Sequence, residues 1–252
     1  MSELHRKIKS FVKREGRMTL GQKLAYEAMM PKYGLSYKEE ILDFKALFGN
    51  DNPVCLEIGF GMGSSLAEQA SLYPNRNYIG IEVHKPGVGA LLLRVQEQGI
   101  TNIRVMSHDA VEVLEHMVAD ESLSLIQLFF PDPWHKRKHH KRRIVQIDFV
   151  MRLFSKLKKS GQFHMATDWQ DYAKYMLKIM LECVKIHSDK KAMPAWSNCS
   201  ETNDYIPKPD DRPSTKFQKR GERLGHGMWD LLFVKAGFVK TGFAKKEIVN
   251  KE

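Results

Sequence analysis

Residues 54–63 read Val-Cys-Leu-Glu-Ile-Gly-Phe-Gly-Met-Gly, and this stretch decides the fold. A short β-rich apolar run, Val54–Ile58, leads into three glycines, and a helix-length segment, 64–73, follows them. Glycines at the carboxyl end of a parallel strand allow a ligand to approach the backbone closely. The stretch therefore predicts a βαβ unit with a ligand site at the end of its first strand.

The same alternation of strands and helices continues along the chain, which predicts an α/β fold with a mostly parallel, doubly wound sheet and helices on both faces. Ser64 and Asp168 stand where helix N-caps are expected. Residues 1–45 form a basic, partly helical extension, and 46–252 form a single domain in which 188–214, with four of the ten prolines, is a long loop. The expected strands are 54–58, 77–83, 103–106, 123–130, 162–167 and 228–234, and the expected helices are 64–73, 87–98, 111–117, 144–158 and 169–185.

Charge gives the first indication of a partner. The 252 residues carry 40 Lys and Arg against 30 Asp and Glu, a formal net charge of +10. Residues 135–143 contain six Lys or Arg and no acid. Such a cluster favours a polyanionic partner, with a solvated face or a nuclear localisation signal as the alternatives.

The three cysteines have no CxxC spacing, which argues against a disulfide framework or a zinc site and favours a reducing compartment. Neither a signal peptide nor a membrane-spanning run is evident, so we expect a cytoplasmic protein without a membrane partner. Cations surround His135, His139 and His140, so no metal is expected there. A monomer and a homodimer both remain open.

The glycine spacing distinguishes between cofactors. Dinucleotide-binding folds prefer G-x-G-x-x-G, whereas Gly59, Gly61 and Gly63 follow G-x-G-x-G with Glu57 just before them. This pattern resembles the first motif of class I S-adenosylmethionine-dependent methyltransferases, in which Glu57 would hold the ammonium group of the cofactor. A dehydrogenase or a purely structural turn remains the alternative.

Further acids end the next two expected strands. Glu82 is placed to accept both ribose hydroxyls of an adenosine, and Asp109 is placed to accept from an adenine amino group. The alternative for Asp109 is a helix N-cap, and it could serve both roles. Three acids at three successive strand ends favour an adenosine-containing cofactor.

The fourth expected strand ends in Phe-Phe-Pro-Asp-Pro-Trp, directly before the basic residues. Pro131 and Pro133 restrict the backbone around Asp132, so its carboxylate is held between cofactor and substrate. Trp134 offers a face on which an unstacked nucleobase could lie, although a Trp packed under a turn is the alternative.

Four stretches together resemble the bacterial tRNA (guanine-N7-)-methyltransferase family: 57–63, 130–136, 164–169 and 212–217. The similarity covers about residues 10–233. It implies methylation of guanine at nucleotide 46 in the tRNA variable loop by S-adenosylmethionine, with tRNA as partner. A nicotinamide-dependent oxidoreductase and a non-catalytic RNA-binding protein on the same scaffold are the rival interpretations.

The resemblance also implies roles for individual residues. Asp132 matches the catalytic acid of the family, and Gln218 replaces the glutamate that the family has at that place. An amide hydrogen-bonds but carries no negative charge, so the role of Gln218 in guanine binding is open. The matching cofactor contacts are Glu57, Glu82, Asp109 and Asp132, the matching guanine or tRNA contacts are Lys136, Asp168, Thr215, Lys216, Phe217 and Gln218, and the matching RNA contacts are Arg17, Lys138, His139, His140, Lys141, Arg142 and Arg143.

Overall fold

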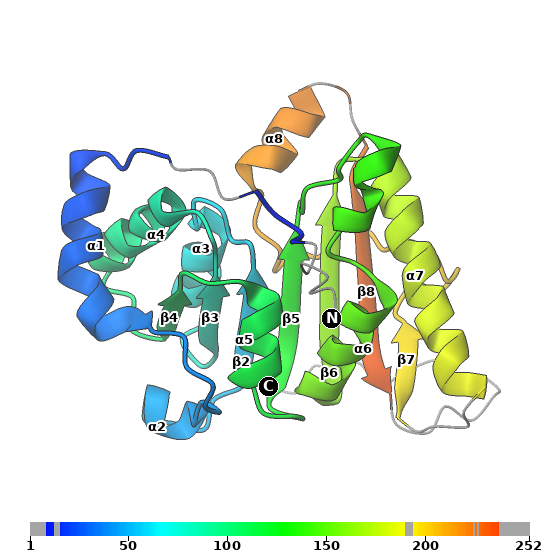
Figure 1. The fold of residues 1–252 in the computed structure, drawn as a ribbon, viewed down its shortest axis with the longest axis horizontal. Helices are drawn as coiled ribbons and strands as arrows, with labels where there is room; N and C mark the ends of the chain where they lie inside the picture. The colour runs from blue at the N-terminus through cyan, green and yellow to red at the C-terminus, as the bar shows by residue number, and fades with distance from the viewer. Residues whose placement is uncertain (1–8, 13–15, 190–193, 224, 226, 237–252) are drawn as a thin grey trace, which may run out of the picture.

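One eight-stranded sheet runs through the protein in a computed structural model that describes residues 9–12, 16–189, 194–223, 225 and 227–236 (Figure 1). The strand order is β1-β4-β3-β2-β5-β6-β8-β7, and only β8 runs antiparallel to its neighbours. The predicted α/β class with a mostly parallel sheet is confirmed. The strands are β1 (Gly34–Leu35), β2 (Val54–Ile58), β3 (Asn77–Ile81), β4 (Ile103–Met106), β5 (Leu123–Phe129), β6 (Leu157–Thr167), β7 (Ala195–Asn198) and β8 (Trp229–Ala236).

The strand order reverses between β2 and β5, which lie side by side at the centre of the sheet. The chain moves outward from β2 to β3 and β4, and then returns to continue on the other side through β5 and β6. Loops at such a reversal leave in opposite directions and open a crevice at the carboxyl ends of the strands. The topology therefore places the ligand site at the ends of β2 and β5.

Helices cover both faces of the sheet, as predicted, because side chains alternate along each strand. In β2, Val54, Leu56 and Ile58 join a core with α5, α6 and α7, whereas Cys55 joins a core with α3 and α4. Among the described residues no helix is both long and apolar enough to cross a lipid bilayer. The helices are α1 (Leu20–Tyr33), α2 (Phe44–Phe48), α3 (Ser64–Leu72), α4 (Lys85–Gln98), α5 (Ala110–His116), the 3-10 helix η1 (Arg137–Arg142), α6 (Ile147–Lys156), α7 (Gln170–Asp189) and α8 (Lys216–Arg223).

Both predicted N-caps are wrong. Gly63, with φ 70°, occupies the cap position of α3 without a side-chain hydrogen bond, so Ser64 is already helical. The helix α7 begins at Gln170, and Trp169 supplies the first acceptor when the Ala173 N–H donates to its carbonyl at 2.9 Å. The helix α3 thus starts one residue earlier than a cap at Ser64 would require, whereas α7 starts one residue later than a cap at Asp168 would require.

The segment 1–45 contributes to the sheet where the structure describes it. The helix α1 begins with a capping box between Thr19 and Gln22, and it packs on α4 (Figure 1). The strand β1 then pairs with β4 and forms the edge of the sheet. The expected boundary near residue 45 remains a prediction about domain organisation.

The expected long loop 188–214 is wrong in one part, because it contains β7. This strand pairs with β8 and buries Trp196, which is 2% exposed, against the rings of Phe154 and Phe163. Prolines on either side concealed the strand in the sequence. The remaining predicted elements agree with the structure to within a few residues, the largest shift being β6, which begins at 157 rather than 162.

Trp196→Ala should lower the free energy of unfolding by about 3–5 kcal/mol, because it leaves a cavity between α6, β6 and β7. Urea denaturation measures the loss. Trp196→Phe should cost less, because the indole nitrogen has no hydrogen-bond partner among the described residues. A loss below about 1 kcal/mol for the alanine variant would show that β7 does not contribute to the core.

Candidate functional site

A cavity of about 660 Å³ lies at the carboxyl ends of the central strands. One sequence-predicted residue reaches it from the end of each of five strands: Gly59 after β2, Glu82 after β3, Asp109 after β4, Asp132 after β5 and Asp168 after β6. Parallel strands direct their carboxyl ends to one edge of the sheet, which is why residues over a hundred positions apart meet here. The cavity is the candidate functional site.

The glycine loop after β2 has a left-handed backbone at all three of its glycines. At Gly63 a Cβ atom would also lie 2.6 Å from the Cβ of Leu91, so α4 packs directly on the loop. Gly87 in the first turn of α4 also allows this close packing, because a Cβ atom at position 87 would lie 2.1 Å from the carbonyl oxygen of Gly61. Sequence reasoning missed Gly87, although the Pro86-Gly87 pair just after Glu82 was a signal for it.

The carboxylate of Glu82 holds the glycine loop against the end of β3. It accepts from the backbone N–H groups of Gly61 at 2.8 Å, Val83 at 2.7 Å and His84 at 2.9 Å. Four lone-pair positions are available on two carboxylate oxygens, so the group still has capacity to accept from a ligand. Glu82 therefore positions the loop in addition to facing the cavity, a role that the sequence did not reveal.

Glu57 lies at the end of β2, 3% exposed and outside the cavity lining. Its Oε2 atom has no hydrogen-bond partner among the described residues. Burial, and secondarily the negative charge of Glu82, raises the pKa of Glu57 to about 8. A cationic hydrogen-bond donor reaching this carboxyl group would supply the missing partner and favour its ionised form.

Asp109 is an N-cap, which confirms the alternative interpretation of this residue. Its Oδ1 accepts from the Val111 N–H at 3.1 Å at the start of α5. Its Oδ2 lies 3.6 Å from the Nζ of Lys9, and the side chain also lines the cavity. The structure thus places Asp109 where both roles are compatible.

A strap formed by residues 9–12 crosses the edge of the cavity, beside the carboxyl end of β5 (dark blue in Figure 1). Ser10, Phe11 and Val12 line the cavity, and the indole Nε1–H of Trp134 donates to the Ser10 carbonyl at 3.2 Å. No sequence pattern marked these residues as part of a site. Only the fold brings them within reach of residue 134.

Backbone strain surrounds Asp132. Phe130 and Trp134 have φ of 52° and 49°, a left-handed conformation that costs non-glycine residues about 1–3 kcal/mol each. Asp132 bridges the turn, since its Oδ1 accepts from the Trp134 N–H at 2.9 Å. We call residues 130–134 the corner; it presents an exposed carboxylate at the mouth of the cavity.

Trp134 is packed on more than one side. The guanidinium of Arg142 lies 5.1 Å from its ring centroid, and the ring of His139 meets it edge-on at 5.8 Å. These contacts support the alternative of a packed Trp. Its use as a platform for a nucleobase remains a prediction.

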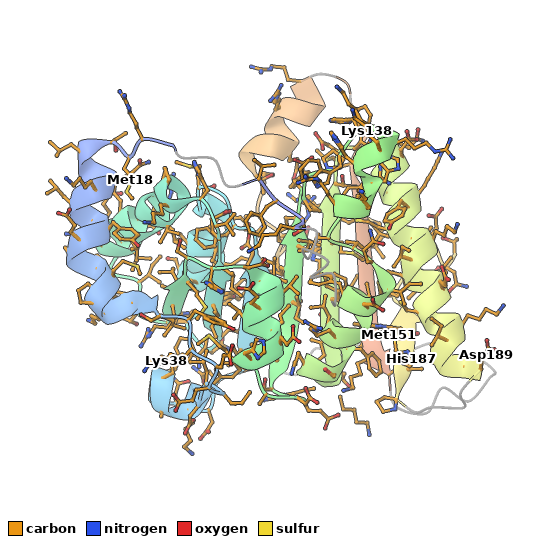
Figure 2. All side chains as sticks on the ribbon, viewed as in Figure 1. Met18, Lys38, Lys138, Met151, His187 and Asp189 are labelled. Atoms are coloured by element: carbon orange, nitrogen blue, oxygen red, sulfur yellow. The ribbon has the colours of Figure 1, made fainter. Side chains whose placement is uncertain are left out.

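The predicted RNA contacts on η1 differ in their exposure to solvent. Lys136, Arg137, Lys138 and Lys141 are exposed, and Figure 2 shows Lys138 at the end of the molecule where β5 ends. His139, His140 and Arg142 are half-buried, and Arg17 is exposed in the segment before α1. Residues 136–142 form a basic rim beside the corner.

Arg143 is a correction to the predicted set. It is 4% exposed, its Nε donates to the Pro133 carbonyl at 2.9 Å, and its guanidinium lies 4.8 Å from the ring centroids of Tyr172 and Tyr175. A buried guanidinium has no room for a phosphate. Arg143 supports the corner through its hydrogen bond to Pro133. The sequence did not reveal that Arg143 is buried, because it belongs to a continuous run of cations.

The segment 215–218 begins α8, which Figure 1 shows above the sheet at the end where β5 terminates. The Thr215 hydroxyl accepts from the Gln218 N–H at 3.1 Å. Gln218 is 5% exposed and does not line the cavity; its Oε1 accepts from Arg212 at 2.9 Å. The side chains of Lys216 and Phe217 lie outside the described residues. Farther along α8, Arg220 does line the cavity.

No group of three His, Cys, Asp or Glu in the described part of the chain is arranged to hold a metal ion. The three histidines near the corner are instead in contact with aromatic or cationic neighbours. His135 meets Trp169 edge-on at 4.3 Å, and His140 lies 3.1 Å from Arg143.

Glu57→Gln should change the pH dependence of stability. The folded-state pKa of Glu57, about 8, lies above its ordinary value of 4.5, so this group stabilises the fold below about pH 4.5 and loses that contribution as the pH rises towards 8. The glutamine variant should therefore gain stability relative to the wild type as pH rises, by at most about 1.4 kcal/mol per pH unit. Urea denaturation between about pH 5 and pH 8 measures the difference.

The exposed residue Glu68 on α3 provides the matched control, Glu68→Gln. Its stability relative to the wild type should follow a flatter course over the same pH range. A constant difference between Glu57→Gln and the wild type would contradict the raised pKa of Glu57.

Known proteins resemble this chain in sequence, and one solved structure resembles it in fold. A family described as putative methyltransferase matches residues 51–231. The tRNA (guanine-N(7)-)-methyltransferase of Pseudoalteromonas translucida is 59% identical over 228 residues, 90% of either chain. That of Yersinia enterocolitica is 56% identical over 228 residues, 90% of this chain and 91% of the relative. The 16S rRNA methyltransferase KamB superposes with a TM-score of 0.54 at 14% identity, over 78% of this chain and 95% of that one, a likeness of fold alone.

Proposed function

Because the chain belongs to the tRNA (guanine-N(7)-)-methyltransferase family, we propose that it transfers a methyl group from S-adenosylmethionine to N7 of a guanine in tRNA. The observation that carries the proposal is the cavity at the ends of five strands. The glycine loop and the acids 82, 109, 132 and 168 lie at this cavity, and the basic rim lies beside it. The product is 7-methylguanosine, and the target is nucleotide 46 of the variable loop.

The residues at the cavity suit this cofactor. S-adenosylmethionine supplies an electrophilic methyl group on a sulfonium centre and also carries an ammonium group and an adenosine. Glu57, whose buried Oε2 lacks a partner, is the acceptor for the ammonium group, directly or through water. Glu82 has remaining capacity for ribose hydroxyls, and Asp109 accepts from the adenine amino group beside its N-cap bond. The glycines 59, 61 and 63 keep the loop free of side chains.

Guanine N7 already carries a lone pair without a proton, so the reaction needs no general base. Catalysis then depends on alignment and on stabilising the positive charge that develops on the purine. Asp132 at the corner and Asp168 after β6 accept from guanine N–H groups, which orients the ring and offsets that charge. Both side chains line the same cavity, which supports the assignment.

The basic rim positions the tRNA while the corner selects one base. Contacts between cations and phosphates determine register but carry no sequence information. Lys136 next to the corner, Arg17, and the exposed cations of η1 are the phosphate contacts, and Thr215 with Lys216 and Phe217 completes the acceptor side. A tRNA-modifying role also fits a cytoplasmic location.

Methyl transfer to tRNA transcripts tests the function. Labelled methyl groups should appear as 7-methylguanosine in a transcript with guanine at position 46 and be absent when adenine replaces it. Nucleoside analysis identifies the product. Salt-sensitive tRNA binding without any transfer would instead favour a non-catalytic RNA-binding protein, and binding of NAD in place of S-adenosylmethionine would favour an oxidoreductase.

Asp132→Asn should lower turnover by roughly 10²-fold, because an amide offsets positive charge poorly, while cofactor affinity stays within a few-fold. Single-turnover transfer and calorimetric titration measure the two quantities. Asp148→Asn, at an exposed position in the first turn of α6, is the control. Near-normal turnover in Asp132→Asn would remove this residue from the mechanism.

Lys138→Ala should weaken tRNA binding and reduce the slope of log K against log salt concentration by about one, the loss of one phosphate contact. Lys159→Ala provides the control, because Lys159 is equally exposed but lies near the start of β6, at the opposite end of the sheet. An unchanged slope in Lys138→Ala would show that the rim does not bind phosphate at this position.

A further inference from the structure

A network of four buried polar side chains joins the sheet to α8. Arg212 forms a fork with Asp230: its Nε lies 2.6 Å from Oδ1, and its Nη2 donates to Oδ2 at 2.9 Å. The Nη1 of Arg212 donates to Gln218 Oε1 at 2.9 Å, and the Nε2 of His164 lies 2.8 Å from Asp230 Oδ1. All four residues are 5% exposed or less.

The charges of the network balance inside the protein. Arg212 contributes one cation and Asp230 one anion, while Gln218 contributes a neutral acceptor. Removing one partner of such a pair leaves an uncompensated buried charge, which is costly. The guanidinium of Arg212 is therefore held in one place by groups from β8 and α8, and its partner Asp230 is in turn bonded to His164 of β6.

The same guanidinium contacts the base of the corner. It lies 5.8 Å from the ring centroids of both Phe129 and Phe130, and the ring of His164 meets Phe129 edge-on at 5.0 Å. Phe130 is one of the two strained residues of the corner, two positions before Asp132. One buried side chain thus touches both the end of β5 and the start of α8.

We propose that Arg212 is a positioning residue for methyl transfer, which keeps α8 and the corner in a constant relation, and that Gln218 acts through Arg212 rather than by contacting guanine. The proposal rests on the proposed function. It accounts for a neutral amide at position 218, because the carboxylate of Asp230 already compensates the one buried cation. What position 218 has to provide is an acceptor for Nη1.

Three variants separate these contacts. Gln218→Met has a similar length but no acceptor, so it leaves an Arg212 N–H group buried without its partner. Gln218→Glu keeps an acceptor at the same place. Arg212→Lys keeps the charge but loses the planar fork that reaches Asp230 and Gln218 together. Glu201→Gln, an exposed position in the loop before Arg212, is the control.

Hydrogen exchange of residues 215–223, measured without tRNA or cofactor, reports on how firmly α8 is held. We expect Gln218→Met and Arg212→Lys to speed exchange there at least about tenfold. Gln218→Glu keeps the acceptor but adds a buried negative charge, so it should speed exchange less than Gln218→Met does. Glu201→Gln should leave exchange within about threefold of the wild type. If Gln218→Met exchanges like the wild type, Arg212 does not hold α8 and the proposal is wrong.

Kinetics distinguish positioning from contact with the base. Positioning predicts that Gln218→Met and Arg212→Lys lower kcat by tenfold or more while Kd for tRNA changes less than threefold, since phosphate contacts supply most of that affinity. The double variant should lose no more than the worse single variant. Losses that multiply, or a raised KM for tRNA with unchanged kcat and unchanged exchange, would mean that Gln218 contacts the substrate directly.

Thermal unfolding separates a loss of positioning from a loss of the folded state. The unfolding temperature of each variant shows whether it is folded at the assay temperature. If Arg212→Lys is unfolded there, Gln218→Met still tests the proposal, because it keeps the ion pair between Arg212 and Asp230. Wild-type protein that transfers no methyl group would contradict the proposed function. The exchange measurements need neither tRNA nor cofactor, so they test whether Arg212 holds α8 independently of the proposed function.

Discussion

The site depends on the hydrogen bonds that the carboxylate of Glu82 accepts. The donors are backbone N–H groups of the glycine loop and of residues 83 and 84. One carboxylate at the end of β3 fixes Gly61 and the entry to α4 at the same time. The loop is thereby held so close to α4 that position 87 tolerates no side chain. A cavity between rigid backbone segments keeps its shape without a ligand, so binding costs little ordering of the protein.

Buried polar groups in this protein fall into two kinds that differ in their partners. Arg143 and Arg212 donate to carbonyl, carboxylate or amide oxygens and lie against aromatic rings, so they hold structure together. Glu57 has a buried oxygen without a partner among the described residues and a raised pKa. A buried acid with a raised pKa beside a cavity is typical of a binding site, whereas a buried cation bonded to oxygens of neighbouring elements is typical of a structural support.

The corner illustrates how support and function are combined. Left-handed φ angles at Phe130 and Trp134 cost free energy, and they persist because neighbours oppose their relaxation. Arg143 holds the carbonyl of Pro133, the strap receives the indole N–H of Trp134, and Arg212 lies under Phe130. Contacts from the following helical turn, from the strap and from Arg212 thus present one exposed carboxylate, that of Asp132.

Local patterns in the sequence determined the parallel strands, the glycine loop and the acids at the strand ends, because these depend on periodicity and on residues adjacent in the chain. They also indicated the basic rim as a unit. Tertiary structure decided which member of a run does what: Arg143 is buried while Lys138 is exposed, and Gln218 turns towards Arg212. It also decided the strand β7, the strap and the contact of Gly87 with the loop. Those features arise from contacts between residues far apart in the chain, and a linear sequence does not record which distant neighbour a side chain will meet.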